Sequence, residues 1–393
     1  QGPDIPVICK TGEGLSVIEN HTQYHNANAN LTFSPKLGGG HDLTLLGGWN
    51  LEHKRARNTK MSRDSFLLDD MINFSVMDGI NYTLADNGSY DWGFIGYYYR
   101  GSYNYKGKYL AEVSGRYDGS SKFPDNQQWA FFPSVSAGWR ISEEPFWNID
   151  PKYVSNVKVR ASYGSLGNGN VSPYSYLELL SPSTSSKVLN GIQNKYVSNP
   201  AVKPEGLTWE TATTVDGGLD FQLLNGRFNF SGDYYVRKTT DMYTVGMTLP
   251  DVFGATSPKG NYADMTTRGW EISVEWKDQF DLGGSPFRYG IKASMHDYTS
   301  VIDKYNNQTG LLSDYYAGMT IGELWGFKSD GLFQSEAELE GYVNTLVAAS
   351  ADGKWRVGDV RYVDLNGNGR IDYGKNTVDD HGDKIIIGNT APH

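Results

Sequence analysis

A short loop near the end of this 393-residue chain contains the side chains best suited to binding a cation. Asp364 opens the loop, and side-chain oxygens follow at its third, fifth and ninth positions, with a glycine at the sixth. These spacings match the first nine positions of an EF-hand calcium loop, in which the seventh residue contributes its backbone carbonyl. The sequence therefore predicts a Ca²⁺ site formed by Asp364, Asn366, Asn368, Arg370 and Asp372.

The match ends at the twelfth position, where an EF-hand has a glutamate that binds calcium through both oxygens. Lys375 occupies that position, so the missing carboxylate would have to come from Asp379, Asp380 or Asp383. The alternative is an ordinary turn rich in asparagine and glycine, held by hydrogen bonds between side chains and backbone. Both interpretations are open at the level of the sequence.

Other residue types that carry chemistry are not arranged as active sites. His21 and His25 share one face of a strand but lack a third metal ligand, so they are better explained as polar pore or loop residues. The glycines from Gly164 to Gly169 lack the lysine and the helix of a phosphate loop. The serines show no nucleophile elbow. The sequence therefore predicts that the chain is not an enzyme.

The elements that must position any site are pairs of strands joined by short turns. The clearest pair covers residues 94–105 and 109–117, with Lys106-Gly107 at the turn. Alternate residues of a strand point to opposite faces, so Val113 and its alternate neighbours form an apolar face, and Glu112 and Arg116 lie on the other. One face suits lipid and the other suits water, which is the pattern of a membrane-spanning β-barrel wall.

The same pattern occurs five times and predicts about ten strands of a larger barrel. The other four pairs are residues 26–33 with 43–51, 135–141 with 157–163, 215–221 with 228–236, and 270–276 with 287–293. Asn225-Gly226 favours the positive φ angles of a type I′ turn. Long polar segments separate the hairpins, at residues 52–91, 118–129, 165–207 and 238–267. We therefore expect an all-β fold, a partial antiparallel up-and-down transmembrane β-barrel wall with short turns at one end and long extracellular loops at the other.

The alternation also assigns individual side chains to the two faces. The residues expected to face lipid are Leu45, Val113, Ala137 and Val274. Those expected to face the lumen are Glu112, Arg116, Ser136 and Glu275. A slip of one residue would reverse each assignment. The first strand, near Ala27, and the last, residues 287–293, are expected to have edges that do not pair with each other.

Composition agrees with this fold without requiring it. The mean hydropathy of -0.51 excludes a transmembrane helix, but a barrel places apolar residues at only every second position. Aromatic residues make up 13% of the chain, which suits the interfacial girdles of a barrel. The net charge of -10 gives no electrostatic footprint for nucleic acid. Cys9 is the single cysteine, so no internal disulfide is expected.

The chain is expected to have two regions. Residues 1–318 hold barrel strands, periplasmic turns and extracellular loops, and residues 319–393 hold a further strand and loop region. In the second region, Ser335 and Glu338 form a capping box before apolar residues at helical spacing, which predicts a short helix at residues 335–348. The Asp/Asn/Gly-rich loop covers residues 364–383. Packing within a loop explains the helix best, and a docking face for a partner is the alternative.

Several runs of residues resemble the SusC/RagA family of TonB-dependent outer-membrane transporters of Bacteroidetes. The most specific is Arg116-Tyr117-Asp118-Gly119-Ser120-Ser121-Lys122-Phe123, followed by Phe131-Phe132-Pro133-Ser134-Val135-Ser136-Ala137-Gly138-Trp139-Arg140-Ile141-Ser142-Glu143-Glu144. Further similar runs are Val159-Arg160-Ala161-Ser162-Tyr163-Gly164, Asp216-Gly217-Gly218-Leu219-Asp220 and Arg268-Gly269-Trp270-Glu271. The resemblance covers most of the chain and is weakest before residue 25 and in the loops.

This resemblance implies an importer in the bacterial outer membrane. Its expected partners are outer-membrane lipid, a SusD-like surface lipoprotein and the TonB complex, which acts through a plug and an N-terminal segment that nothing in these residues resembles. Because such transporters have about 22 strands, we expect the chain to be an internal piece of the barrel. The implied cargo is an oligosaccharide or a peptide, and no nucleic acid is expected.

Aromatic residues outside the alternating strands are the candidates for contacting that cargo. They are Trp129, Trp147, Tyr174, Tyr176 and Tyr243, which suit sugar stacking and loop packing equally well. Two other classes of protein fit the sequence. One is a surface or secreted β-rich glycan-binding or adhesin module, whose apolar faces would pack together as a sandwich. The other is a β-rich glycoside hydrolase that uses two acids from Asp118, Asp125 and Glu210.

Overall fold

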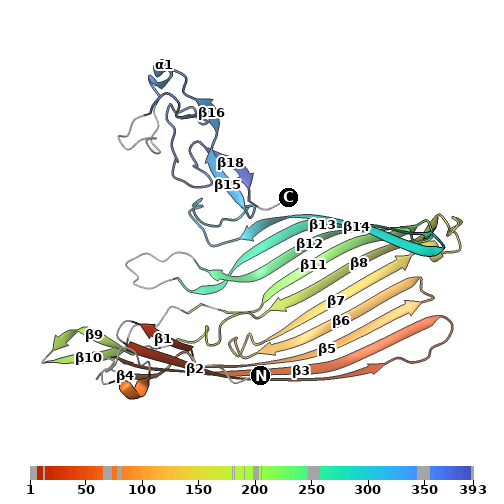
Figure 1. Ribbon diagram of the computed structural model, residues 1–393, viewed down its shortest axis with the longest axis horizontal. Helices are drawn as coiled ribbons and strands as arrows, with labels where there is room; N and C mark the ends of the chain where they lie inside the picture. The colour runs from red at the N-terminus through yellow and green to blue at the C-terminus, as the bar shows by residue number, and fades with distance from the viewer. Residues whose placement is uncertain are drawn as a thin grey trace.

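One large antiparallel sheet dominates the computed structural model of the chain (Figure 1). The structure describes residues 7–11, 14–64, 73–77, 82–178, 180, 182–189, 191–197, 203–204, 206–246, 257–342 and 355–390. The order of the strands is β1-β2-β3-β5-β6-β7-β8-β11-β12-β13-β14, and β4 pairs with β3 beside β5. The bounds are β1 Val7–Thr11, β2 Gly14–Phe33, β3 His41–Asp64, β4 Tyr82–Asp86, β5 Tyr90–Tyr105, β6 Tyr109–Ser120, β7 Trp129–Arg140, β8 Val154–Asn168, β11 Glu210–Leu223, β12 Phe228–Val245, β13 Lys259–Leu282 and β14 Ser285–Lys304.

The ten predicted strands are all present, and they form the predicted up-and-down meander. Each strand is longer than predicted, because pairing continues beyond the alternating stretch that identifies the strand in the sequence. β3 and β13 each have 24 residues, whereas about ten residues of a tilted strand cross a bilayer. The strands therefore extend well past the membrane at the end that carries the long loops.

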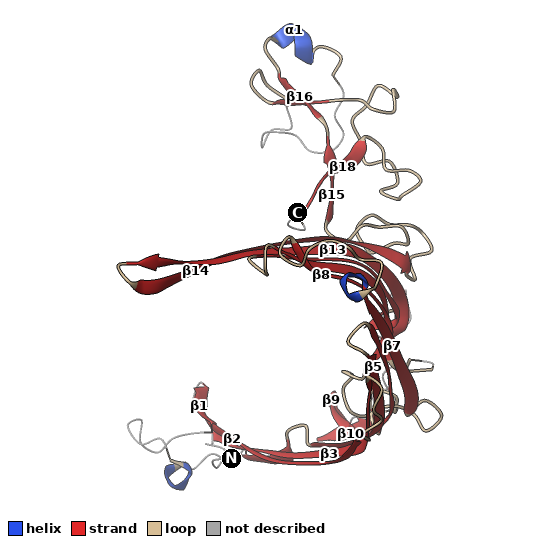
Figure 2. Ribbon diagram, turned by 90° about the vertical axis from the view of Figure 1, so that its right-hand side faces the viewer, coloured by secondary structure: helices blue, strands red, loops and turns tan. Residues whose placement is uncertain are grey.

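The sheet curves strongly but does not close into a barrel. Figure 2 shows it edge-on as a broad arc, with β2 near one end and β14 at the other. Within the described residues, β14 pairs with β13, and its other edge meets only an isolated bridge from Val301 to Thr320 at the loop end. β2 beyond Ile18 pairs only with β3. The predicted free edges at the two outer strands are thus confirmed for the part of the chain that the structure describes.

Short connections lie at one end of the sheet and long ones at the other, as predicted (Figure 1). In the β5–β6 turn, Lys106 and Gly107 both have positive φ angles, of 52° and 68°. The β11–β12 connection is longer than a two-residue turn, since Leu223 pairs with Phe228. In it Leu224, Asn225 and Gly226 all have positive φ, so the Asn-Gly pair supplies only part of the reversal.

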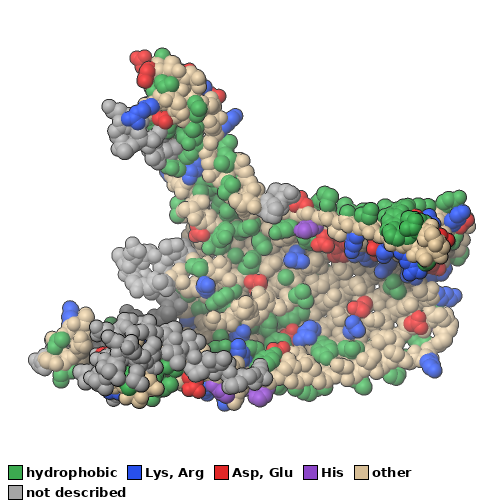
Figure 3. Space-filling view, in the orientation of Figure 1, with side chains coloured by type: hydrophobic (Ala, Val, Ile, Leu, Met, Phe, Trp, Pro, Cys, Tyr) green, Lys and Arg blue, Asp and Glu red, His purple; other side chains and the backbone are tan. Residues whose placement is uncertain are grey.

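The two faces of the sheet differ in polarity, in the phase that the sequence predicts. Leu45 and Val113 lie on the convex face and are 44% and 50% exposed. Glu112 and Ser136 are paired in register on the concave face, which Figure 3 shows dotted with acidic and basic side chains. A single sheet with this many exposed large apolar side chains does not match the sandwich alternative, in which such faces pack against each other.

Aromatic side chains border the apolar band of the convex face on both sides. Toward the loop end, the Trp129 ring stacks on Tyr117 and Tyr97, with centroid distances of 4.9 and 6.4 Å. Toward the turn end, Tyr105 stacks on Tyr109 at 6.3 Å, and Trp139 is 39% exposed beside them in the sheet. Two such girdles mark the interfaces of a membrane-spanning barrel. Among the described helices, none is long and apolar enough to cross a membrane.

Most of the smaller elements lie at the loop end. There β9 (Pro182–Leu189) and β10 (Ile192–Val197) form a hairpin, and residues Phe74–Val76 form a 3-10 helix. A second 3-10 helix, Ile141–Glu143, follows β7 at the turn end. After β14, β15 (Glu323–Phe327) pairs with β18 (Lys384–Asn389), and β16 (Ser329–Leu332) pairs with β17 (Val360–Tyr362). The Ile302 amide donates a hydrogen bond to the Met319 carbonyl at 2.9 Å, which ties this region to the end of β14.

The helix in this region, α1 (Glu336–Leu339), is shorter than the predicted span of residues 335–348. It ends because Glu340 is extended and Gly341 has a φ of 81°, outside the helical region. The capping box is also modified: Ser335 makes no side-chain cap, and the Glu338 carboxylate accepts from the Gln334 amide at 3.0 Å. Residues 343–348 lie outside the described residues.

Candidate functional site

Polar side chains cover the concave face in rows that cross neighbouring strands. Glu112 of β6 pairs with Ser136 of β7, and the row continues through Ser162 of β8 to Asp216 of β11. These positions are the polar half of the period-two pattern. The curvature of the sheet turns the rows toward a common interior, where polar groups can meet an aqueous cargo.

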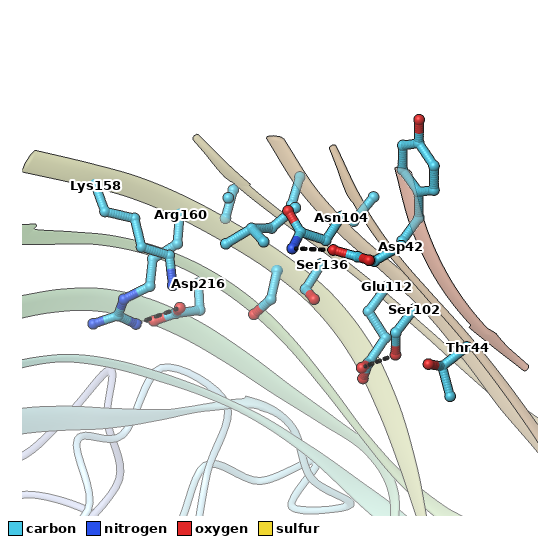
Figure 4. A pocket seen from close by; sticks show the side chains of 16 residues that line it. Asp42, Thr44, Ser102, Asn104, Glu112, Ser136, Lys158, Arg160 and Asp216 are labelled. Carbon is cyan, nitrogen blue, oxygen red and sulfur yellow. Dashed lines mark hydrogen bonds and ion pairs between the residues drawn. The ribbon is translucent and has the colours of Figure 1, made fainter. Parts of the chain in front are cut away.

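A cavity of about 500 Å³ lies on this face toward the turn end, and its side chains come from six strands, β3, β5, β6, β7, β8 and β11. Figure 4 shows these side chains from close by. The Ser102 hydroxyl donates a hydrogen bond to Glu112 at 2.7 Å. The Asn104 amide donates to the Asp42 carboxylate at 3.3 Å. These carboxylates are therefore held by neutral donors on the adjacent strand.

Arg160 is the centre of a charged network on β8, β11 and β12. Its Nε donates to Asp220 at 3.1 Å, and its Nη2 donates to Asp233 at 2.6 Å. Nη2 also donates to the Ser231 hydroxyl at 3.1 Å, and Asp216 lies 3.9 Å from Nη1. One guanidinium is thus shared among three carboxylates, so the network fixes the arginine firmly in the wall.

A glycine makes room for this network. A Cβ atom on Gly218 would lie 2.5 Å from an Asp233 oxygen and 2.6 Å from the Arg160 Cζ. The Arg160 guanidinium therefore occupies the space above Gly218 that the side chain of any other residue would fill. Sequence reasoning did not single out Arg160. The available indication was an arginine on the polar face of its strand, followed by a strand that contains Asp-Gly-Gly-Leu-Asp.

A second network has the same design nearer the loop end. Arg116 donates to both oxygens of Asp118, at 2.9 and 3.1 Å, and to the Asn50 side chain at 3.1 Å. A Cβ on Gly96 would lie 2.4 Å from the Asp118 carboxylate. Asp118, one acid of the hydrolase alternative, is therefore already engaged by a guanidinium. The concave face thus presents charged side chains that are held in place by ion pairs and hydrogen bonds, which suits a lining.

At the loop end, the connections after β6, β8 and β10 fold onto the concave face around a small apolar cluster. The cluster consists of Phe123, Phe132, Val171, Leu207 and Trp209, each at most 6% exposed. The Trp209 indole N–H donates to the Gln128 carbonyl at 3.0 Å, which fastens two loops together. Sequence reasoning missed this loop cluster. The available indication was Phe132, an aromatic residue on the polar face of β7, which does not face lipid.

Three of the five predicted cargo-contacting aromatics lie around the loop cluster. Tyr176 and Tyr243 pack against it, and the Tyr174 hydroxyl accepts a hydrogen bond from the Asp91 amide at 3.0 Å. Trp129 is on the convex face, stacked in the aromatic girdle. Trp147 is in the connection between β7 and β8 at the turn end. The structure therefore brings Tyr174, Tyr176 and Tyr243 to one region and leaves the two tryptophans elsewhere.

The predicted calcium residues lie together in one loop and bind its backbone. Asp364 accepts from the Gly367 and Gly369 amides, each at 2.7 Å. Asn368 accepts from the Arg370 amide at 2.8 Å, and its own amide group lies 3.4 Å from the Asp372 carboxylate. These hydrogen bonds are expected of an ordinary turn, and they also orient the aspartates of calcium loops. They therefore agree with both interpretations. Calcium binding here stays a prediction.

Of the three acids considered as the missing ligand, Asp383 is fully buried. It accepts from the Leu365 and Asp372 amides, at 2.8 and 2.9 Å, and so closes the loop internally. Burial and a hydrogen bond to Glu323 raise the pKa of the nearby Tyr316 phenol to about 12. Asp383 and Tyr316 therefore serve the internal packing of residues 364–383 and 316–325, respectively.

Comparison with known proteins identifies the class of this wall. The family described as TonB dependent receptor-like, beta-barrel matches residues 10–384. The TonB-dependent receptor P26 of Formosa agariphila is 28% identical over 98% of this chain and 38% of its own length. The TonB-dependent receptor SusC of Bacteroides thetaiotaomicron is 31% identical over 71% of this chain and 27% of its own. The solved structure of the RagAB peptide transporter superposes with a TM-score of 0.68 at 19% identity, over 89% of this chain and 38% of that one.

The chain belongs to the TonB-dependent receptor-like β-barrel family. Its relatives are SusC-like and RagA-like proteins of the bacterial outer membrane, which confirms the predicted family, fold and location. Membership of a family of receptors and transporters also agrees with the prediction that the chain is not an enzyme. The chain spans about two fifths or less of the length of these relatives.

Proposed function

We propose that this chain forms part of the wall of an outer-membrane importer that takes up oligosaccharides or peptides together with a SusD-like surface lipoprotein. The observation that carries this proposal is the opposition of the two faces. The convex face is apolar between two aromatic girdles, and the concave face carries polar rows and networks of paired charges. A wall of this kind separates lipid from an aqueous interior.

The loop cluster supports a role in admitting cargo at the cell surface. Phe123 and Trp209 join the loops into a packed unit beside the concave face, and Tyr176 and Tyr243 lie on its border. Aromatic rings at such a border stack on sugar rings and on apolar peptide side chains alike. We therefore assign Tyr174, Tyr176 and Tyr243 to the cargo-contacting region of the mouth.

The names of the relatives support the choice of cargo and partners. RagAB is described as a peptide transporter, and SusC as a TonB-dependent receptor. We propose the TonB complex as the energy source, because the family is named for that dependence. The SusD-like lipoprotein is proposed as the partner on the side of the long loops.

Uptake by cells that carry the full-length receptor tests the proposal. Deletion of its gene should abolish uptake of either a fluorescent oligosaccharide mixture or a fluorescent peptide mixture, and loss of TonB should have the same effect. An affinity-tagged receptor should retain a surface lipoprotein during purification in detergent. Unchanged uptake of both mixtures in the deletion strain would contradict the proposal.

A matched pair of tyrosines tests the role of the mouth. Tyr243→Ala removes a ring at the loop cluster, and Tyr97→Ala removes a ring that is 49% exposed in the girdle. At equal receptor abundance, we expect Tyr243→Ala to lower uptake and Tyr97→Ala to leave it unchanged. Equal effects of the two substitutions on uptake would contradict the proposal that the loop cluster contacts the cargo.

A further inference from the structure

The convex face changes from apolar to polar within two residues on β2, β3 and β5, and the basic side chains there come from β2 and β3. Rows of paired residues show the change: Ala29, Trp49 and Tyr97 are followed by Ala27, Leu51 and Ile95. The next row toward the loop end is His25, His53 and Gly93, and the one after it is Gln23, Arg55 and Asp91. His21 pairs with Arg57 in the row beyond. We call His25, His53, Arg55 and Arg57 the basic band.

The basic band lies at the depth of lipid headgroups. Residues two apart on a strand are separated by about 6.6 Å along it, which is about 5 Å along the membrane normal for a strand tilted by about 40°. The polar layer on each side of a bilayer is roughly 5 to 7 Å thick. If the row of Leu51 ends the apolar band, the row of His53 falls in this layer. Because the long loops are at this end, the layer belongs to the outer leaflet.

Asp91 orients the band by accepting one hydrogen bond each from His53 and Arg55. One carboxylate oxygen accepts from His53 Nε2 at 2.7 Å, and the other accepts from Arg55 Nε at 2.9 Å. The two terminal nitrogens of Arg55 make no hydrogen bond to the described residues, and its side chain is 47% exposed. The His25 and His53 rings are parallel, at a centroid distance of 6.3 Å. The arrangement therefore directs an exposed guanidinium fork and two imidazoles away from the protein.

We propose that the basic band binds the phosphate group of an anionic lipid in the outer leaflet, whose charge no headgroup cation offsets. The band is continuous with the lipid-facing surface, so a lipid is the molecule that must lie against it. An arginine fork matches two oxygens of a phosphate, and imidazole N–H groups add further donors. The role concerns the lipid around the barrel and depends on its orientation in the outer membrane, not on the cargo proposed above.

Lipid retention by the full-length receptor, purified in a non-ionic detergent, tests this proposal. The probes are phosphatidylglycerol and phosphatidylcholine, each added alone, and native mass spectrometry counts the lipids that stay bound. The parent should retain phosphatidylglycerol in preference to phosphatidylcholine. Arg55→Gln should lower this retention about tenfold, which corresponds to about 1.4 kcal/mol and to the loss of one charge-assisted hydrogen bond.

Lys54→Gln is the matched control, because Lys54 is the next residue of β3 and lies on the opposite face. It should leave lipid retention unchanged. Heat-modifiable migration on gels shows that each variant is folded, and His25→Gln combined with His53→Gln replaces Arg55→Gln if that variant does not fold. The combined variant should also lower retention several-fold, since charge-assisted bonds contribute about 1.5 to 3 kcal/mol each.

Five results would overturn the proposal. Four are equal retention of the two lipids, unchanged retention in the variants of the band, equal loss in Lys54→Gln, and complete displacement of the lipid by free inorganic phosphate. The fifth is loss of a co-purifying protein in Arg55→Gln with lipid retention intact, which would assign the band to a protein partner instead.

Discussion

The glycine beneath the Arg160 network gives the sharpest test of how the wall is held together. We predict that Gly218→Ala destabilises the barrel, because the new Cβ would lie 2.5 Å from Asp233 Oδ1 and 2.6 Å from Arg160 Cζ. Both atoms are at the ends of side chains, so the backbone need not move. The guanidinium must instead leave Asp233, which weakens hydrogen bonds that involve charged groups. The expected cost is about 1 to 3 kcal/mol of unfolding free energy.

Gly217 provides an internal control. It is the neighbouring residue of β11, on the other face, and a Cβ there would meet nothing within 4 Å. Gly217→Ala should therefore change the unfolding free energy by less than about 0.5 kcal/mol or raise it slightly, since alanine loses less conformational entropy on folding. The two substitutions are chemically identical, so their difference reports the network alone.

The measurement is urea-induced unfolding of the full-length receptor in lipid vesicles, followed by heat-modifiable migration. A second series with Arg160→Gln completes a double-mutant cycle. In that background, the cost of Gly218→Ala should fall to that of Gly217→Ala, because the group that the Cβ displaces is gone. Equal costs for the two alanines, or a Gly218→Ala cost that persists without Arg160, would refute the reasoning.

Three further predictions follow from other parts of the wall and loops. Val113→Arg should cost about 2 to 4 kcal/mol of unfolding free energy near the bilayer midplane, whereas Ser114→Arg on the concave face should cost far less in the same urea titration. At the turn end, hydrogen bonds from Tyr109 and Trp139 hold the pKa of Glu144 below its ordinary value. The stabilisation from the Glu144 carboxylate is therefore complete above the unfolded-state pKa and is lost as pH falls through the lower folded-state value, so unfolding midpoints should lose this acid-side step in Glu144→Gln. In calcium-containing crystals, density at about 2.3 to 2.6 Å from the Asp364, Asn366 and Asp372 oxygens would establish the predicted ion, and water at longer distances would leave an ordinary turn.

Strand order and face polarity were predictable because they depend on neighbouring residues. Val113 and Glu112 are adjacent in the sequence, so they lie on opposite faces of the strand, and the bilayer requires the apolar one to face lipid. The strand ends were not predictable in the same way. Beyond Leu51, β3 continues through His53 and Arg55, where no alternation of apolar and polar residues marks a strand.

The loop cluster was not predictable because its members come from three separate connections and from strand β7. Phe132 of β7 and Trp209 of the connection before β11 are far apart in the sequence, and only the folded sheet brings them together. The Arg160 network has the same origin, since Asp220 and Asp233 reach it across strand pairing. The alternation of apolar and polar residues identifies the face of the sheet on which such residues lie. It does not identify which of them are in contact.

The length of β3 sets how far the receptor stands out from the cell. The twelve residues from His53 to Asp64 follow the apolar band and remain paired with β2. At about 3.3 Å per residue and a tilt of about 40°, they raise the rim roughly 30 Å above the hydrocarbon, which is another membrane thickness. Nutrients, antibodies and bacteriophages arriving from outside would thus reach this collar before they reach the lipid. The first contact with the receptor is at a height where surface polysaccharide, rather than the bilayer, is the surrounding medium.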